Sequence, residues 1–189
     1  MKFDVILAGV GGQGVLSIAA IIARAAVLEG LSVRQSEVHG MAQRGGAVLA
    51  HLRISDKKIA GDLVPKGGAD IIISMEPLES LRYVSWLSPA GALVTSSDPF
   101  VNIGNYPNPE DIAAEIKRLP LWRLVGAEEL AKKAGLSKAV NMVMVGASSR
   151  FLPVKQKSLE KTITEVFSAK GAETAGANVK PFQLGREAV

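Results

Sequence analysis

A glycine-rich turn near the amino terminus is the first segment of the sequence whose composition suits chemistry. Residues 9–14 read GVGGQG; they follow the apolar run 3–8 and precede an alanine-rich stretch with helical periodicity. A strand, a glycine turn and a helix in this order point the first N–H groups of the helix, at the positive end of its dipole, toward a bound phosphate or carboxylate. The candidate ligand-binding residues of this turn are Gly9, Gly11, Gly12, Gln13 and Gly14. The alternative is that the glycines only permit a compact turn.

Glu37 bears on whether that ligand is a dinucleotide. It follows the glycine turn at roughly the 20-residue distance at which dinucleotide-binding folds place the acid that holds the adenosine ribose. An ordinary carboxylate at the end of a strand is an equally good interpretation. A nicotinamide-binding site therefore stays open at this point.

A second loop, residues 36–46, combines an imidazole, an amide, a guanidinium and three glycines in the sequence SEVHGMAQRGG. In a doubly wound sheet it leaves the carboxyl edge of the second strand beside the glycine turn, which is where such folds bind ligands. Its candidate residues are Glu37, His39, Gly40, Gln43, Arg44, Gly45 and Gly46. The guanidinium of Arg44 is suited to clamp a phosphate with two hydrogen bonds. The alternative is a solvated connection in which Arg44 pairs with Glu37.

Several kinds of catalysis are excluded or disfavoured by what the sequence lacks. The chain has no cysteine, so it forms no disulfide, no thiolate zinc site and no Fe–S cluster of its own. His39 and His51 are its two histidines, and no acid lies at ligand spacing from both, so we expect no metal site. His51 lies in an apolar stretch and is interpreted as a core or interface imidazole. No nucleophile motif and no Walker A lysine is found, and we assign no catalytic residue.

The composition is that of one globular domain of 189 residues, 48% hydrophobic, with a net charge of +4. The charge is too small, and the aromatic content of 5% too low, to indicate nucleic-acid binding. No apolar window reaches the ~18 residues of a membrane span, and residues 1–5 do not resemble a secretory leader. We therefore expect a cytoplasmic protein that binds neither nucleic acid nor membrane.

The elements that must position the two loops alternate between strand-like and helical patterns, which predicts an α/β fold. Specifically, we predict a Rossmann-like three-layer sandwich with a mostly parallel sheet, made mixed by a hairpin between 47–54 and a short strand from Ile59. Strands are predicted at 3–8, 32–38, 47–54, 69–75, 92–95 and 121–125, and helices at 15–28, 77–87, 111–119, 128–134, 138–150 and 158–170. Residues 1–189 form a single domain in this interpretation. Because residues 171–189 contain few large apolar side chains, we expect a loose tail or an arm that wraps a partner.

The pairing of GVGGQG at 9–14 with EVHGMAQRGG at 37–46, followed by VLAHLR at 48–53, resembles the gamma-type module of 2-oxoacid:ferredoxin oxidoreductases. Within that family the chain is most similar to the beta subunits of the indolepyruvate enzymes, and the resemblance covers nearly the whole chain. Further matching segments are Asp62-Leu63-Val64-Pro65 with Gly67, Glu76-Pro77-Leu78-Glu79, Asn141-Met142-Val143-Met144 and Leu184-Gly185-Arg186-Glu187.

The resemblance implies an accessory subunit that is inactive alone. Members of the family oxidatively decarboxylate a 2-oxoacid, here an aryl pyruvate such as indolepyruvate, transfer the acyl group to coenzyme A and reduce ferredoxin. Thiamine diphosphate, magnesium and the Fe–S clusters are then expected in a larger alpha subunit. A role of the glycine turn and Arg44 in holding coenzyme A is a weaker implication. The alternatives are a free-standing NAD(P)-dependent dehydrogenase and a non-catalytic nucleotide-binding module.

Overall fold

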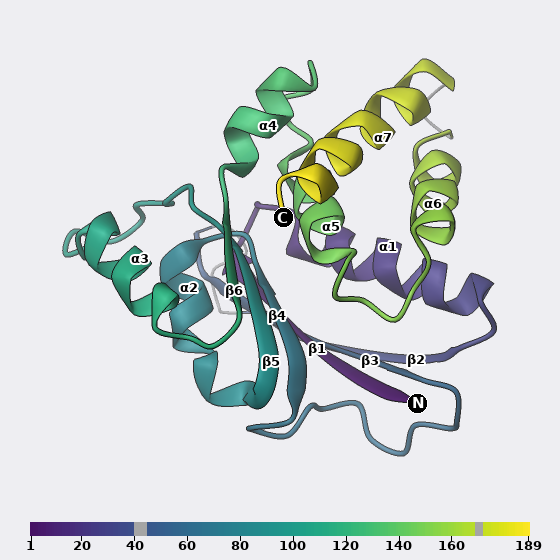
Figure 1. Cartoon of the computed structure of the whole chain (residues 1–189), viewed down its shortest axis with the longest axis horizontal. Coiled ribbons are helices and arrows are strands. Elements are labelled where there is room, and N and C mark those ends of the chain that lie inside the picture. Colours follow the sequence, from purple (N-terminus) through teal and green to yellow (C-terminus); the bar gives the residue numbers. More distant parts are fainter. Residues whose placement is uncertain (40–44, 169–171) are drawn as a thin grey trace.

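A computed structural model describes residues 1–39, 45–168 and 172–189 of the chain (Figure 1). The described residues form a six-stranded sheet in the order β2-β3-β1-β4-β5-β6. Its strands are β1 (Lys2–Val10), β2 (Ser32–His39), β3 (Ala47–Ser55), β4 (Ala69–Ser74), β5 (Leu87–Ser96) and β6 (Trp122–Val125). Strands β1, β4, β5 and β6 are parallel, and β3 is antiparallel to both of its neighbours, β1 and β2. The predicted α/β fold with a mostly parallel, mixed sheet is confirmed.

The antiparallel strand is placed differently from the prediction. The mixed character comes from β3, which pairs with β2 on one side and β1 on the other, whereas Ile59 begins no strand. Parallel neighbours need a long crossover connection, but only residues 40–46 join β2 to β3, so these two strands must run antiparallel. The consequence for the site is that β2 is separated from β1 by a whole strand.

Helices cover both faces of the sheet, as expected for a three-layer sandwich. They are α1 (Val15–Leu28), α2 (Pro77–Arg82), α3 (Pro109–Lys117), α4 (Ala127–Lys133), α5 (Val140–Ser148), α6 (Gln156–Ser168) and α7 (Ala172–Glu187), with a 3-10 turn at Val84–Trp86. Figure 1 shows α2 and α3 on one side of the sheet and α1, α5, α6 and α7 on the other. Successive side chains of β1 point to opposite faces of the sheet. Leu7 packs in the larger core beneath α1 and α5, and Ile6 packs in the smaller core beneath α3.

The segment after β4 departs from the prediction of a helix up to residue 87. Helix α2 ends at Arg82, and β5 begins at Leu87 rather than at Ala92. Residues 89–91, which lie between the predicted helix and the predicted strand, are extended, and the pairing of β5 with β4 is irregular between Ala69 and Ile71. Gly91 fits this irregularity because a β-carbon there would lie 2.7 Å from the carbonyl oxygen of Ala69. Sequence periodicity does not reveal such a bulge.

Residues 172–187 do not form the loose tail that was one of the two expectations for the C-terminus, whereas the other, an arm that wraps a partner, stays a prediction. They form α7, which packs on α5 and α6 of the same chain, with Phe182 fully buried. Large apolar residues are few here because glycines bring the helix backbones of α5 and α7 into direct contact. A segment can therefore be fixed by close backbone packing with little apolar side-chain area.

Candidate functional site

The glycine turn joins β1 to α1 as predicted, and its shape depends on glycine at three positions. Gly9, Gly12 and Gly14 adopt φ angles of 156°, 104° and 84°, in the region that other residues rarely occupy. Gly14 precedes the first helical residue, Val15, without a capping side chain. The N–H of Ser17 donates to the carbonyl oxygen of Gly14 at 3.0 Å, whereas the N–H groups of Val15 and Leu16, the first two of α1, have no acceptor within a helix and are available to an anion.

Gln13 points into the protein and stabilises the turn. Its Oε1 accepts a hydrogen bond from the backbone N–H of Val10 at 2.7 Å, and its Nε2 donates to the carbonyl oxygen of Met75 at 3.4 Å. The side chain thereby joins the carboxyl ends of β1 and β4. Gln13 therefore acts by holding the turn, and the sequence pattern alone did not distinguish this from a ligand contact.

Gly11 pairs with the end of the second loop. Its N–H donates to the carbonyl oxygen of Gly46 at 2.8 Å, and its carbonyl oxygen accepts from the N–H of Gly45 at 3.2 Å. These bonds extend the antiparallel ladder of β1 and β3 beyond the strands. The backbone groups of Gly11, a predicted ligand-binding residue, are thus hydrogen-bonded to the second loop of the same chain in this structure.

Among the other predicted residues of the second loop, Gly40, Gln43 and Arg44 lie outside the described residues, as does the side chain of His39. Glu37 lies on β2, exposed, and accepts a hydrogen bond from Gln35. Because β3 separates β2 from β1, Glu37 is two strand spacings from β1, roughly 10 Å rather than the ~5 Å of adjacent strands. The acid therefore does not occupy the place it has in a dinucleotide site.

A third loop, residues 97–108 between β5 and α3, meets the glycine loops at the same edge of the sheet. The Nδ2 of Asn102 donates to the carbonyl oxygen of Gly45 at 2.7 Å. The side-chain amide of Asn102 thus links the third loop to the second loop, more than fifty positions earlier in the chain. The two prolines and three asparagines of residues 97–108 are typical of an irregular loop, but they do not indicate this contact.

Glu76 anchors this third loop from the interior. Its side chain is 1% exposed; it caps α2 by accepting from the N–H of Glu79 at 2.7 Å, and it also accepts from the N–H of Phe100 at 3.4 Å and from the hydroxyl of Tyr106. Burial raises the pKa of Tyr106, and the neighbouring Glu76 carboxylate raises it further. In the sequence, Glu76 belongs to the segment 76–79 that matches the family, but its bonds to the third loop become visible only in the fold.

A small hollow lies over the start of α1. It encloses about 270 Å3 and is open to solvent. Its walls are Val10, Gly11, Gly12, Gly14, Val15, Leu16 and Val48. The start of α5 lies close by, since a β-carbon at Gly14 would be 3.1 Å from Nδ2 of Asn141. Two helix N-termini with positive dipole ends therefore lie close together beside a hollow with no acidic lining, which suits an anionic ligand.

His51, the second histidine of the chain, lies in the core and away from the glycine turn. His51 is 4% exposed, and its Nδ1 accepts from the N–H of Val64 at 3.2 Å, so its interpretation as a core imidazole is confirmed. Burial, and secondly the charge of Arg53, lower the pKa of His51.

The described residues contain no group of three or more potential metal ligands. In the same part of the chain, no helix has the length and apolarity needed to cross a bilayer.

Comparison with known proteins gives close matches over the full length. The model of the family "Pyruvate ferredoxin/flavodoxin oxidoreductase" matches residues 4–188. The indolepyruvate oxidoreductase subunit IorB of Archaeoglobus fulgidus is 38% identical over 194 residues, covering 98% of this chain and 94% of that protein. These matches confirm the family resemblance seen in the two loops.

Solved structures agree on the fold. A 2-oxoglutarate:ferredoxin oxidoreductase from Magnetococcus marinus, solved with 2-oxoglutarate, coenzyme A and succinyl-CoA, has a TM-score of 0.79 at 21% identity. The alignment covers all of this chain and 31% of that one, so there the fold is part of a longer polypeptide. The gamma subunit of a keto/oxoacid ferredoxin oxidoreductase from Geobacter sulfurreducens has a TM-score of 0.71 at 23% identity, covering 98% and 96% of the two chains. The chain belongs to the pyruvate ferredoxin/flavodoxin oxidoreductase family.

Proposed function

We propose that this chain is the small accessory subunit of a 2-oxoacid:ferredoxin oxidoreductase that acts on an aryl pyruvate such as indolepyruvate. The observation that carries the proposal is the 38% identity to an indolepyruvate oxidoreductase subunit over nearly the whole of both chains. In this reaction the 2-oxoacid loses carbon dioxide and its acyl group replaces the thiol proton of coenzyme A. One proton and two electrons are released, and ferredoxin accepts the electrons.

The reaction needs groups that this chain is not equipped to hold. It has no cysteine for an Fe–S cluster, and the described residues offer no acidic or histidine cluster for a magnesium ion. Thiamine diphosphate with its magnesium and the Fe–S clusters therefore belong, in this proposal, to a larger alpha subunit, which also docks ferredoxin. We place the complex in the cytoplasm, the compartment that contains coenzyme A and ferredoxin.

The glycine turn is the part of this chain that we assign to coenzyme A. The diphosphate or the 3′-phosphate of coenzyme A suits the neighbouring N-termini of α1 and α5, since backbone N–H groups and aligned helix dipoles favour a negative charge. Gln13 holds the turn from below, and Gly11 is fixed by Gly45 and Gly46. Arg44 is the side chain of the second loop that we expect to add a bidentate phosphate contact.

A free-standing nicotinamide enzyme is not favoured. The acid that would hold the ribose, Glu37, is separated from the glycine turn by β3. The hollow at the turn is about 270 Å3, below the ~300–1,000 Å3 of sites that enclose a ligand by themselves. A non-catalytic nucleotide-binding module shares these features with the accessory subunit, and only an assay of the complex separates the two.

The deciding experiment is purification of the chain with its natural partner, followed by an assay of viologen reduction. We expect reduction that depends on an aryl pyruvate and on coenzyme A, and none from the chain alone. Replacing Arg44 by Ala should raise the KM for coenzyme A in the complex. NAD(H) binding and turnover by the isolated chain would overturn the proposal.

A further inference from the structure

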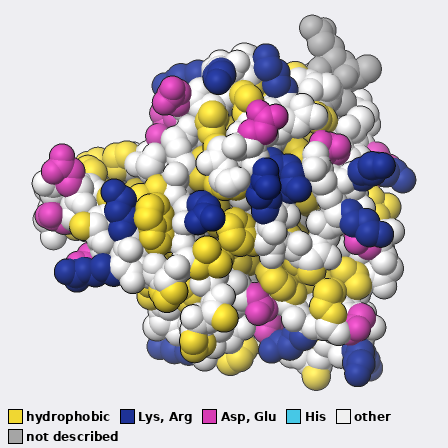
Figure 2. Space-filling model, viewed as in Figure 1, with side chains coloured by type: hydrophobic (Ala, Val, Ile, Leu, Met, Phe, Trp, Pro, Cys, Tyr) yellow, Lys and Arg dark blue, Asp and Glu magenta, His cyan; other side chains and the backbone are white. Residues whose placement is uncertain are grey.

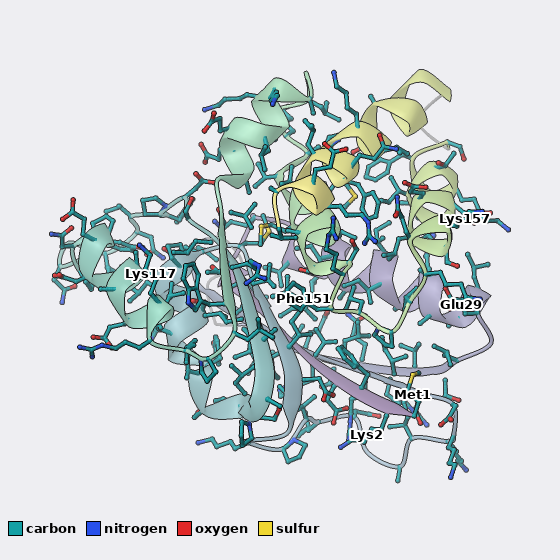
Figure 3. The ribbon with its side chains drawn as sticks, in the orientation of Figure 1. Met1, Lys2, Glu29, Lys117, Phe151 and Lys157 are labelled. Carbon is teal, nitrogen blue, oxygen red and sulfur yellow. The ribbon has the colours of Figure 1, made fainter. Side chains whose placement is uncertain are left out.

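Large apolar side chains are exposed at both ends of the sheet. Within the described residues, those toward the amino ends of the parallel strands are Met1, Val27, Leu28 and Leu63, and those toward the carboxyl ends are Val38, Phe100, Val101 and Ile103. Figure 3 labels Met1, Lys2 and Glu29, which mark the first of these ends at the lower right. In Figure 2 apolar side chains lie along the upper left, where Figure 1 shows the loop between β5 and α3. The second group shares its edge with the glycine turn.

Three of these side chains are held outward by a loop that is anchored from below. Phe100, Val101 and Ile103 lie in the third loop, whose backbone N–H at Phe100 and hydroxyl at Tyr106 both bond to buried Glu76. An apolar loop that is already held in place loses little conformational entropy when a partner covers it. The exposed apolar side chains of this loop are therefore preorganised for contact with a partner.

The same loop is tied to the candidate ligand site. Asn102 lies between Val101 and Ile103 and donates to the carbonyl oxygen of Gly45, whose N–H in turn donates to Gly11. Whatever covers the apolar side chains thus lies next to the second loop and the glycine turn.

The site also needs another wall. A hollow of about 270 Å3 that is open to solvent cannot enclose a ligand as large as coenzyme A, which calls for the upper end of the ~300–1,000 Å3 range. This chain supplies the backbone N–H groups and the residues that line the base of the hollow. A second protein seated on the third loop would stand where the remaining wall is required.

The chemistry of the loop selects among the partners in the proposed reaction. Residues 99–106 contain no charged side chain. An acidic electron carrier is recognised by lysine and arginine through a transient, polar surface, whereas permanent subunit interfaces are apolar.

We propose that Phe100, Val101 and Ile103, here named the docking triad, bind the larger subunit, and that this subunit closes the hollow over the glycine turn. The inference rests on the proposed function. It places the coenzyme A site between the two subunits.

The test uses two matched substitutions. Val101 is 67% exposed on the docking triad, and Val27 is 59% exposed at the end of α1, toward the opposite edge of the sheet. V101D should weaken association with the larger subunit by about tenfold or more, measured by titration of the purified subunits, whereas V27D should leave it unchanged. Equal affinities for V101D and the native chain, or equal losses in both variants, would overturn the proposal.

Hydrogen exchange of the unmodified chain gives a second readout that does not depend on how V101D folds. On complex formation we expect slower exchange at residues 99–106 and no change around Val27. Absence of protection at 99–106 in a formed complex refutes the docking triad. If the complex forms through this loop yet reduces no viologen with any aryl pyruvate, the docking triad stands and the proposed function fails.

Discussion

Gly146 of α5 and Phe182 of α7 pack backbone against backbone: a β-carbon at Gly146 would lie 1.9 Å from the carbonyl oxygen of Phe182. Gly185 repeats the arrangement, since its β-carbon would lie 2.0 Å from the carbonyl oxygen of Val143. Arg186 adds a hydrogen bond of 2.6 Å to the hydroxyl of Ser149. The two helices therefore approach more closely than any side chain at these positions would allow.

Replacing Gly146 by Ala should separate α5 from α7. Overpacking of this kind costs about 3 kcal/mol, which for a chain of this length lowers Tm by roughly 6–12 °C. The matched control is Gly176→Ala in α7, where a β-carbon meets nothing within 4 Å. That variant should be neutral or stabilised by up to ~1 kcal/mol, because alanine favours helix. Equal Tm values for the two variants would contradict the close packing.

Asp4 and Arg53 form a buried ion pair near the amino end of the sheet. The Asp4 carboxylate is fully buried and accepts from Arg53 Nε at 2.8 Å and Nη2 at 3.1 Å. Arg53→Met leaves that carboxylate paired with the exposed Lys2, whose Nζ lies 2.8 Å from Oδ2, and should cost about 2–3 kcal/mol in the free energy of unfolding. The double variant with Asp4→Asn removes the charge as well, so it should be more stable than the sum of the single losses predicts. Strict additivity in denaturant unfolding would show that the pair is not coupled.

The stability of the protein should fall at mildly acidic pH because of His51. Its neutral Nδ1 accepts from the N–H of Val64, and burial lowers its pKa below that of the unfolded chain. The unfolded state therefore binds the proton first, so the contribution of His51 is complete above its unfolded pKa of ~6.5 and is lost as pH falls through the folded pKa. The slope is at most about 1.4 kcal/mol per pH unit.

His51→Asn isolates this effect, because an amide oxygen can accept the same hydrogen bond without titrating. Unfolding free energies measured from pH 7.5 to 5.5 should decline more steeply in the native chain than in this variant. Parallel curves would rule out His51 as the source.

Asn102 should affect ligand affinity more than catalysis. Its hydrogen bond to Gly45 fixes the segment that pairs with Gly11, and a bond of this kind contributes about 0.5–1.5 kcal/mol. In the complex proposed above, Asn102→Ala should raise the KM for coenzyme A about 2–10-fold with kcat little changed. Gln156→Ala removes an exposed amide in α6 and serves as the control. A fall in kcat at constant KM would contradict a role in positioning the loop.

The local sequence determined those features that depend on neighbouring residues. The apolar run before GVGGQG and the alanine-rich stretch after it predicted β1, the turn and α1, because periodicity and glycine content act over a few residues. The two loops were also sufficient to indicate the family. The absence of cysteine already excluded Fe–S ligation by this chain.

Tertiary structure decided which of these segments meet. It placed β3 between β1 and β2, which moved Glu37 away from the turn, and it turned Gln13 inward onto Met75. It also brought Asn102 to Gly45 and packed α7 on α5, where glycine acts through backbone approach and leaves no hydrophobic pattern to detect. Such contacts join residues far apart in the chain, and their energies depend on the geometry of the folded core, which no local pattern encodes.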